Sequence, residues 1–571
     1  GAAGGGGSGA GGGGGVAGVI PSSVHPDFRL WLTSMPAPYF PVPVLQNGVK
    51  LTNEPPKGVR ANLTRSLANV DTWTSWADGI DGKFDNGVDR KTAWHKLGFG
   101  LMFFHAVIQE RRKFGPLGFN IRYEFNDSDL ETSLQVLKRF LGEQPVVPWE
   151  AMRYVTGQIN YGGRVTDDWD RRCLMSILGQ YVTPTVLDDS YRFSASGEYF
   201  APPSGKLETF QAYVAGLPQN DGPGIFGMHN NANITFQANE TDAILKTCLS
   251  IQPRAAAATS SGDEAGGKDD EDDDGDGDAA LVSGPDAEVS ALASEVASAL
   301  PALLDREEAG ESTFVYRGEH MDSLATVLSQ EMVRFNKLLA VMERSLMELQ
   351  KAIRGEALMS DELDRMYGAL LNNQVPGNWE AAAYPSLKPL ASWTKDLATR
   401  IEFMRSWVVG GQPAVFWLSG FFFPQGFMTG TLQNHARKYS LPIDTLGFGF
   451  TITDKPQASD VVEADVPEDG VLVSGLFMDG AQWDATRRSV AESKPGEMFS
   501  SVPVIHFRPE QDYKPNPAEY SAPVYKTSVR AGTLSTTGMS TNFVIAVDMP
   551  TDADPAKWVL MGCALLCQLN D

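Results

Sequence analysis

The sequence has 571 residues and a formal net charge of -24, with 42% hydrophobic and 10% aromatic residues. That length and composition suit two or more globular domains with sizeable cores. So acidic a protein is a poor candidate for non-specific binding to nucleic acid or to anionic membranes. No signal peptide is visible, and no apolar run approaches the ~20 residues that a membrane helix needs. Because the sequence begins with glycine in the middle of a pattern, we expect it to be part of a longer polypeptide.

Cysteine and histidine spacing predicts no metal site. The four cysteines are Cys173, Cys248, Cys563 and Cys567. They form no CxxC pair, so we predict neither a zinc ribbon nor a redox motif and expect buried free thiols in a reducing compartment. His95 and His105 lie on one predicted helix without the i, i+4 spacing of metal ligands, and no HExxH motif occurs. We interpret both as packing or surface residues.

The first part of the sequence passes from glycine to a short apolar segment and then to helices. Residues 1–18 are mostly glycine and should be disordered. Phe28–Thr33 reads as a buried strand, and the prolines that follow, at 36, 38, 41 and 43, predict an extended path. A helix is expected from about Ala61. Residues 88–114 form the strongest helical pattern of this part, with a one-sided core stripe that includes Leu97 and Ile108. Further helices are predicted at 128–142, 148–160, 167–182, 206–215 and 238–251, with a small hairpin at 191–199.

A charged corner lies between two of these helices, at Asn160–Arg172. Gly162 and Gly163 break the first helix, and Thr166 or Asp167 can cap the second. The charges of the corner belong to Arg164, Asp167, Asp168, Asp170, Arg171 and Arg172. We interpret them as an ion-paired corner, and the alternative is a carboxylate pair for acid–base chemistry. No histidine or nucleophile lies nearby in the sequence to complete such a site.

Residues 253–287 interrupt the helical pattern with alanine, glycine and a long acidic run. Like charges repel and nothing apolar packs there, so we predict a solvated, disordered linker. Gly262–Lys268 matches GxxxxGK, but Asp269 replaces the required Ser or Thr, so we reject a phosphate-binding loop. Calcium binding by the acidic run lacks the ligand spacing of an EF-hand.

Helices resume after the linker, at 286–300, 321–353, 360–373 and 389–409. Residues 321–353 carry apolar side chains at alternating steps of three and four. Such a heptad seam predicts either an intermolecular coiled coil or packing against helices of the same chain, which we favour because more helices follow. Phe416–Phe427 contains no charge and is interpreted as core at a domain junction, before a helix at 429–439.

From residue 441 onward the hydrophobic period changes to two. Strands are predicted at 446–453, 471–477, 502–507, 522–526, 542–547 and 558–569. Turn signals such as Asp479-Gly480 separate them. Six such strands in sequence predict a closed antiparallel barrel or a sandwich.

Four stretches of the sequence resemble the C-terminal part of dynein heavy chains. They are NYGGRVTDDWDRR from Asn160, FGMHNNANI from Phe226, WLSGFFFPQGFMTGTLQNHARKYSLPID from Trp417, and APVYKTSVRAGTLSTTGMSTNFV from Ala522. The last two are similar to the axonemal group, and within that group we expect an inner-arm heavy chain. His229 and its neighbouring asparagines are interpreted as a turn and capping cluster, with a ligand site as the alternative. The glycine-rich start and the acidic linker depart from the family pattern and bear on loop length.

The resemblance implies an α+β fold in which a mainly helical part precedes helices and an antiparallel β-barrel. The expected parts are a disordered 1–18, the end of the AAA+ large subdomain at 19–87, its helical small subdomain at 88–252, the linker at 253–287, and a C-terminal domain with helices at 288–440 and a barrel at 441–571. Thr33 or Ser34 holds the position of a nucleotide sensor in active AAA+ modules, but the family's sixth module is not a nucleotide site.

The function that the resemblance implies is mechanical. Dynein heavy chains are ATP-driven, minus-end-directed microtubule motors, and the axonemal forms act in cilia and flagella, within the cytoplasm and its cytoskeleton. The segment should close and brace the AAA+ ring, with no catalytic, cofactor-binding or metal-binding residue of its own. ATP and Mg would bind other modules, microtubules would bind parts outside this segment, and the expected partners are those modules and other dynein subunits. Two alternatives stay open, a heptad-mediated dimerising scaffold and an unrecognised hydrolase.

Overall fold

The computed structural model describes residues 25, 27–34, 40–51, 56–76, 80–251, 284–311, 313–317, 320–533 and 540–570. The chain divides into two compact units, Gly1–Pro55 and Pro56–Asp571. The predictions made for residues 1–18, for nearly all of 253–287 and for the GxxxxGK match lie outside the described residues.

The strand predicted at Phe28–Thr33 is wrong. The described residues 27–34 are irregular and exposed, and the side chain of Trp31 is 77% exposed. A strand is stabilised by backbone hydrogen bonds to a neighbour, and no described strand pairs with this segment. The extended path predicted for the prolines fails at Pro43, which lies in the first turn of α1 (Val42–Asn47), where proline is tolerated.

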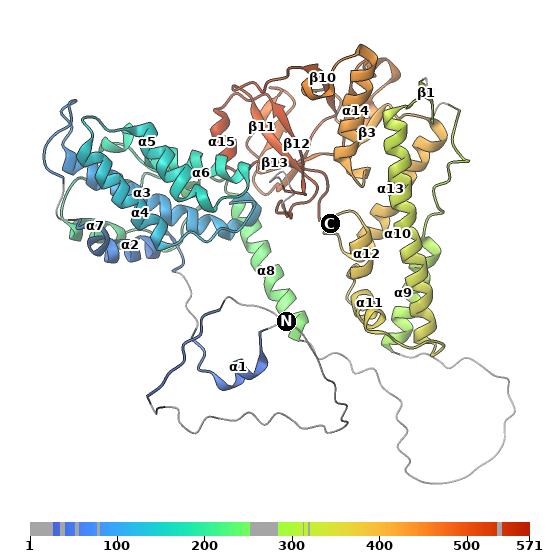
Figure 1. Ribbon diagram of the computed structural model, residues 1–571, viewed down its shortest axis with the longest axis horizontal. Helices are drawn as coiled ribbons and strands as arrows, with labels where there is room; N and C mark the ends of the chain where they lie inside the picture. The colour runs from blue at the N-terminus through green and yellow to red at the C-terminus, as the bar shows by residue number, and fades with distance from the viewer. Residues whose placement is uncertain are drawn as a thin grey trace, which may run out of the picture. The chain divides into compact units, whose positions relative to one another are not determined.

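The larger unit begins with a helical part built around α3 (Arg90–Arg111). The helices predicted around it are confirmed, with α2 at Val59–Thr74, α4 at Asp127–Glu143, α5 at Trp149–Tyr154, α6 at Asp168–Tyr181, α7 at Leu207–Ala215 and α8 at Ala232–Ile251. Figure 1 shows α2, α4 and α6 gathered around α3. The sequence predicts that only one side of α3 is buried. In the structure every residue from Ala93 to Ile108 is buried, so the helix is covered on all sides over this stretch. The predicted hairpin at 191–199 is a turn, closed by a hydrogen bond from the Phe193 N–H to the Tyr199 carbonyl.

Both histidines of α3 are packing residues, as predicted. The Nδ1 atom of His95 lies 2.8 Å from the Ser204 hydroxyl, and that of His105 lies 2.9 Å from the Tyr161 hydroxyl. Burial lowers the pKa of the His105 imidazole to about 3, so this side chain is neutral at physiological pH.

The C-terminal domain begins with a helical bundle around α10 (Ser323–Ile353). Its other helices are α9 at Pro285–Ala299, α11 at Asp361–Leu371, α12 at Gly377–Ala382, α13 at Leu390–Gly410 and α14 at Pro424–Tyr439. The heptad seam of α10 faces these helices, which confirms the predicted intramolecular packing. Phe416, Phe421 and Phe427 are buried, so the apolar segment is core as predicted. Glu331 of α10 is buried against that segment and accepts hydrogen bonds from the Phe422 and Phe423 N–H groups.

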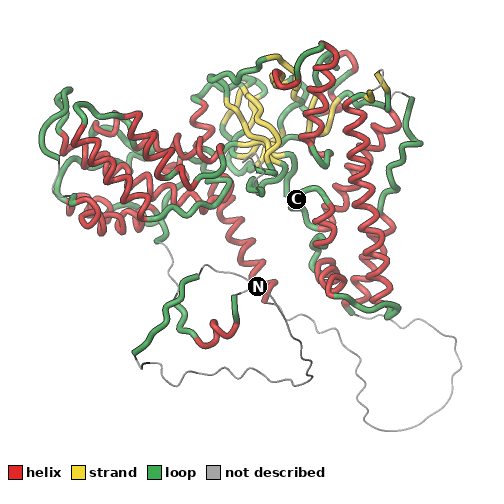
Figure 2. Tube along the Cα trace, in the orientation of Figure 1, coloured by secondary structure: helices red, strands yellow, loops and turns green. Residues whose placement is uncertain are grey.

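The β part follows the helices, as predicted, but the closed antiparallel barrel is wrong. Within the described residues, two larger sheets form, with strand orders β3-β5-β10-β4 and β12-β11-β13-β6-β9. Figure 2 shows these strands between helical regions. The strands are β3 (Val415–Trp417), β4 (Leu446–Ile452), β5 (Val471–Ser474), β6 (Phe477–Asp479), β9 (Phe499–Ser501), β10 (Ile505–Gln511), β11 (Tyr520–Tyr525), β12 (Phe543–Met549) and β13 (Ala564–Leu566). A small hairpin of β7 (Gln482–Asp484) and β8 (Ser489–Ala491), and a pair of β1 (Tyr316–Arg317) and β2 (His320–Met321), complete them.

Two parallel pairings explain why the alternation of the sequence is misleading here. β3 enters from the helical bundle and pairs in parallel with β5, and β13 pairs in parallel with β11. A parallel pair of strands is joined by a crossover connection through other parts of the chain. The alternation of apolar residues predicts that a segment is a strand, but it does not predict which strand lies beside it. The strand predicted at 558–569 is wrong in its first half, because Asp554 caps and Pro555 starts a short helix, α15 (Pro555–Leu560).

Three of the four free thiols are buried, at Cys173, Cys563 and Cys567, as predicted, whereas Cys248 on α8 is exposed. Burial raises the pKa of the Cys563 and Cys567 thiols to about 12. These two side chains therefore pack as small apolar groups and carry little thiolate at neutral pH.

Candidate functional site

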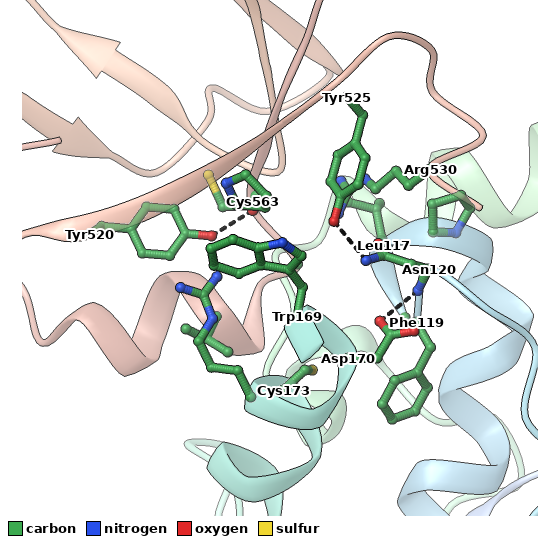
Figure 3. A pocket seen from close by; sticks show the side chains of 16 residues that line it. Leu117, Phe119, Asn120, Trp169, Asp170, Cys173, Tyr520, Tyr525, Arg530 and Cys563 are labelled. Carbon is green, nitrogen blue, oxygen red and sulfur yellow. Dashed lines mark hydrogen bonds between the residues drawn. The ribbon is translucent and has the colours of Figure 1, made fainter. Parts of the chain in front are cut away.

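The charged corner at Asn160–Arg172 lies against the β part of the C-terminal domain (Figure 3). The helical part contributes the segment Leu117–Asn120 and the first turn of α6. The C-terminal domain contributes β11 and the turn between α15 and β13. We call this meeting point the junction. A cavity of about 30 Å³ lies within it, which leaves room for buried water but not for a larger ligand.

Arg111 is the most connected side chain of the junction. It ends α3 and is fully buried. Its guanidinium donates to the Gly118 carbonyl at 3.2 Å, to the Leu560 carbonyl at 3.1 Å, and to the Phe226 carbonyl. Leu560 ends α15, so one buried cation joins the helical part to the C-terminal domain. The planar guanidinium holds five N–H donors in fixed directions, which suits it to bind several carbonyl groups at once.

A second connection runs through Asn120. Its side-chain amide donates to the Tyr525 hydroxyl of β11 at 2.8 Å (Figure 3). The same amide donates to the Asp167 carboxylate at 3.3 Å. Asp167 caps α6, since its carboxylate accepts hydrogen bonds from the Trp169 and Asp170 N–H groups at 3.0 Å. The cap of α6 and the β11 hydroxyl thus share one amide group. Of the two predicted caps of α6, Thr166 and Asp167, the structure has Asp167.

Asp170 is buried beside this amide and binds the backbone of the neighbouring segment. Its carboxylate accepts hydrogen bonds from the N–H groups of Asn120 at 2.8 Å and Ile121 at 3.0 Å. Burial, and then the nearby Asp167 carboxylate, raise the pKa of Asp170 to about 7. Asp170 therefore holds Asn120 in the position from which its amide reaches Tyr525.

Aromatic and cationic side chains form the third connection. The Arg172 guanidinium lies 4.5 Å from the Trp169 ring centroid and 5.4 Å from that of Tyr520, and it donates to the Ser521 carbonyl at 2.9 Å. The Trp169 ring lies 5.7 Å from the ring of Phe543 on β12. Such cation–π contacts contribute more when they are shielded from water, as at a junction between two folded parts.

Two glycines allow the backbones to approach closely at the junction. Gly562 has φ +68°, and a Cβ atom there would lie 2.2 Å from the Leu117 carbonyl oxygen. Gly227 has φ +72°, and its Cβ would lie 3.0 Å from the Cβ of Leu560. Any side chain at Gly562 would collide with rigid backbone and would also disfavour the left-handed conformation.

A separate contact joins the two parts through Asn231. Its side-chain amide donates to the carbonyls of Lys494 at 2.8 Å and Glu497 at 2.9 Å, and its Oδ1 accepts from the Gly496 N–H at 3.0 Å. The Asn231 N–H also contacts the His229 Nδ1 at 3.2 Å, which confirms the predicted turn cluster. The sequence does not indicate that this asparagine reaches the β part.

The predicted ion pairing of the corner is only partly confirmed. Arg164 pairs with Asp129 of α4 at 2.9 Å, outside the corner, and Arg171 lies 3.9 Å from Asp168. Asp167 and Asp170 instead bind backbone N–H groups. The carboxylate oxygens that acid–base chemistry would use are thus engaged in holding the junction, which favours a structural role.

In the described part of the chain, no group of three or more His, Cys, Asp or Glu side chains is arranged to hold a metal ion. No described helix is long and apolar enough to cross a membrane.

Three family models match the sequence. The C-terminal domain of the dynein heavy chain matches residues 238–567, the dynein heavy chain AAA lid domain matches 94–232, and the dynein heavy chain region D6 P-loop domain matches 16–52. The chain therefore belongs to the dynein heavy chain family. It is 47% identical to human dynein axonemal heavy chain 6 over 96% of its length, and 43% identical to human dynein axonemal heavy chain 3 over 97%. It spans only 13% of the length of either relative. The junction thus lies between the lid and the C-terminal domain of a dynein heavy chain.

Replacing Arg111 by methionine should destabilise the junction strongly. The change keeps an apolar stem but leaves the carbonyls of Gly118, Phe226 and Leu560 without their donor, and each buried unsatisfied group costs about 1–3 kcal/mol. We expect a loss of at least about 3 kcal/mol in the free energy of unfolding. Faster amide hydrogen exchange in α15 should accompany it. Arg112→Met, the same change at a partly exposed neighbour, is the control and should have little effect on either measurement. Equal effects of the two variants would contradict the role of Arg111.

Asp170 should make stability depend on pH. Its pKa is about 7 in the folded chain and 3.8 ordinarily, so the folded state binds the proton more tightly. Its contribution to stability is therefore fully present below pH 3.8 and is lost as the pH rises to about 7. Compared with Asp170→Asn, which does not titrate, the wild type should lose at least about 1.4 kcal/mol over this range, because one pKa unit corresponds to that energy. Urea unfolding at several pH values measures this difference, with Asp168→Asn on the same turn as the exposed control. The prediction would be refuted if the free energy of unfolding of the wild type, relative to that of Asp170→Asn, stayed constant or increased as the pH rises.

Proposed function

We propose that this chain is the force-transmitting end of an ATP-driven motor that moves along microtubules in the axoneme of cilia and flagella. The relatives named above are axonemal dynein heavy chains, and the sequence is similar to them over nearly all of its length. The family supports association with other dynein subunits and with microtubules. The proposed partners in direct contact are other AAA+ modules of the same heavy chain, and the microtubule contact lies in parts outside this segment.

The observation that carries the mechanical role is the junction. Arg111, Asn120 and Arg172 reach from the lid to carbonyl and hydroxyl groups of the C-terminal domain. A displacement of the lid therefore pulls directly on β11 and α15, without an intervening flexible segment at these contacts. In our proposal the C-terminal domain braces the lid, so that a movement begun elsewhere in the motor is passed on as motion of one body.

Our proposal assigns ATP hydrolysis, with its Mg cofactor, to other modules of the heavy chain. Two features support this. The GxxxxGK match at Gly262–Lys268 lacks the following Ser or Thr. Thr33 and Ser34, the two candidates for the sensor position, lie in an exposed irregular segment.

Calorimetric titration of the purified protein with Mg·ATP and Mg·ADP tests this assignment. We expect no saturable heat at nucleotide concentrations up to about 1 mM, because affinities weaker than this correspond to less than about 4 kcal/mol of binding energy. The same titration with a heavy chain that contains the other AAA+ modules is the positive control. Saturable binding to the short chain, or measurable ATP turnover by it, would overturn the assignment and favour a catalytic function.

A further inference from the structure

A cavity of about 410 Å³ lies within the C-terminal domain, away from the junction. One wall is the connector between α12 and α13, with Tyr384 and Leu387, and the side chain of Trp393 continues it. The opposite wall is the loop between β11 and β12, with Val529 and Asn542. The volume falls within the range of pockets that hold small molecules or peptide side chains. Residues 534–539 of that loop lie outside the described residues and form no part of the walls named here.

The connector wall is held in place by stacked rings. The ring centroids of Trp379 and Trp393 lie 6.0 Å apart, and those of Trp393 and Tyr384 lie 6.2 Å apart, with nearly parallel planes in both pairs. The Arg400 guanidinium lies 3.9 Å from the Tyr384 centroid and closes the stack. The Gln568 amide donates to the Pro385 carbonyl and fixes the connector to the last residues of the β part. The connector wall is therefore preformed, and a ligand would not have to order its residues on binding.

The polar residues that line the cavity combine hydroxyl groups, one amide side chain and one carboxylate. Asn542 is 6% exposed; its Nδ2 donates to the Thr527 hydroxyl at 2.9 Å and to the Val529 carbonyl. Its Oδ1 is itself buried, so this side chain supports the Val529 wall from behind and is not exposed to a ligand. Glu380 is exposed and is the only charged residue among the described lining residues.

The walls also expose apolar surface to solvent. Leu387 is 43% exposed and Val529 is 47% exposed, on opposite sides of the cavity. Exposed aliphatic side chains around a hollow with a polar rim are typical of protein-interaction sites. The negative charge at Glu380 and the net charge of -24 favour a positively charged ligand, both at the cavity and during approach.

We propose that this cavity binds an extended, positively charged peptide segment of a partner protein. An aliphatic side chain of the peptide packs between Leu387 and Val529 and against the rings of Tyr384 and Trp393. A neighbouring lysine or arginine of the peptide pairs with Glu380 at the rim. This site is independent of the junction and gives the C-terminal domain a means of docking another protein while the lid contacts remain intact.

Fluorescence anisotropy with two labelled hexapeptides tests the proposal on the whole protein. One probe is Gly-Leu-Lys-Val-Lys-Gly, and the other replaces both lysines by glutamate. We expect saturable binding of the lysine probe and at least tenfold weaker binding of the glutamate probe. Val529→Asn should weaken the lysine probe roughly tenfold, because it removes the apolar contact from one wall. Glu380→Gln should weaken it by up to about fivefold, as for an exposed charge pair.

Matched controls separate specific docking from general attraction to an acidic protein. Val409→Asn changes a valine on α13 that is 55% exposed and outside the cavity, and Glu362→Gln removes an exposed carboxylate of α11. Both controls should bind the lysine probe as the wild type does. Absence of saturable binding, or equal weakening by a cavity variant and its control, would overturn the proposal. Because neither variant lies at the junction, such a failure would leave the proposed motor function untouched.

Discussion

The structure depends on one buried cation at the end of the longest lid helix. Arg111 is surrounded by backbone carbonyls that come from the lid and from the C-terminal helix α15. A buried guanidinium is costly unless its N–H groups are satisfied, so the segments that supply these carbonyls must stay together for the side chain to be accommodated. The hydrogen bonds of Asn120 and the ring contacts of Arg172 act across the same surface. Together they fix the C-terminal domain to the lid by polar contacts with defined directions, which apolar packing alone does not provide.

This arrangement explains why the corner at Asn160–Arg172 combines glycines, acids and arginines. Gly162 and Gly163 lie in a short 3₁₀ turn that follows the first helix. Asp167 caps the next helix, and Asp170 orients the segment that carries Asn120. Arg172 then extends from α6 to β11. Asp167, Asp170 and Arg172 thus serve backbone geometry or a contact with the C-terminal domain, whereas Arg164 pairs with Asp129 inside the lid. The concentration of charge, which suggests a reactive site when the sequence is considered alone, is used to build an interface.

Much of the fold can be predicted from the sequence, and the failures have physical causes. Helices such as α4, α10 and α13 are predictable because their apolar residues recur at helical spacing. The barrel is wrong because parallel partners, such as β11 and β13, are set by crossover connections that local alternation does not encode. The strand at Phe28–Thr33 is wrong because apolar character alone supplies no hydrogen-bonding neighbour. The cap at Asp167 follows from local rules, whereas the reach of Asn120, Asn231 and Arg111 across hundreds of residues does not, since long-range partners leave no trace in sequence spacing.

The central claim is that the lid and the C-terminal domain form one mechanical body through the junction. A double-mutant cycle between Asn120→Ala and Tyr525→Phe measures it most directly, because the two side chains lie on opposite sides and share one hydrogen bond of 2.8 Å. Our account predicts a coupling energy of about 1 kcal/mol in the free energy of unfolding, as expected for a buried hydrogen bond. A coupling energy within about 0.3 kcal/mol of zero, the usual result for independent sites, would contradict it.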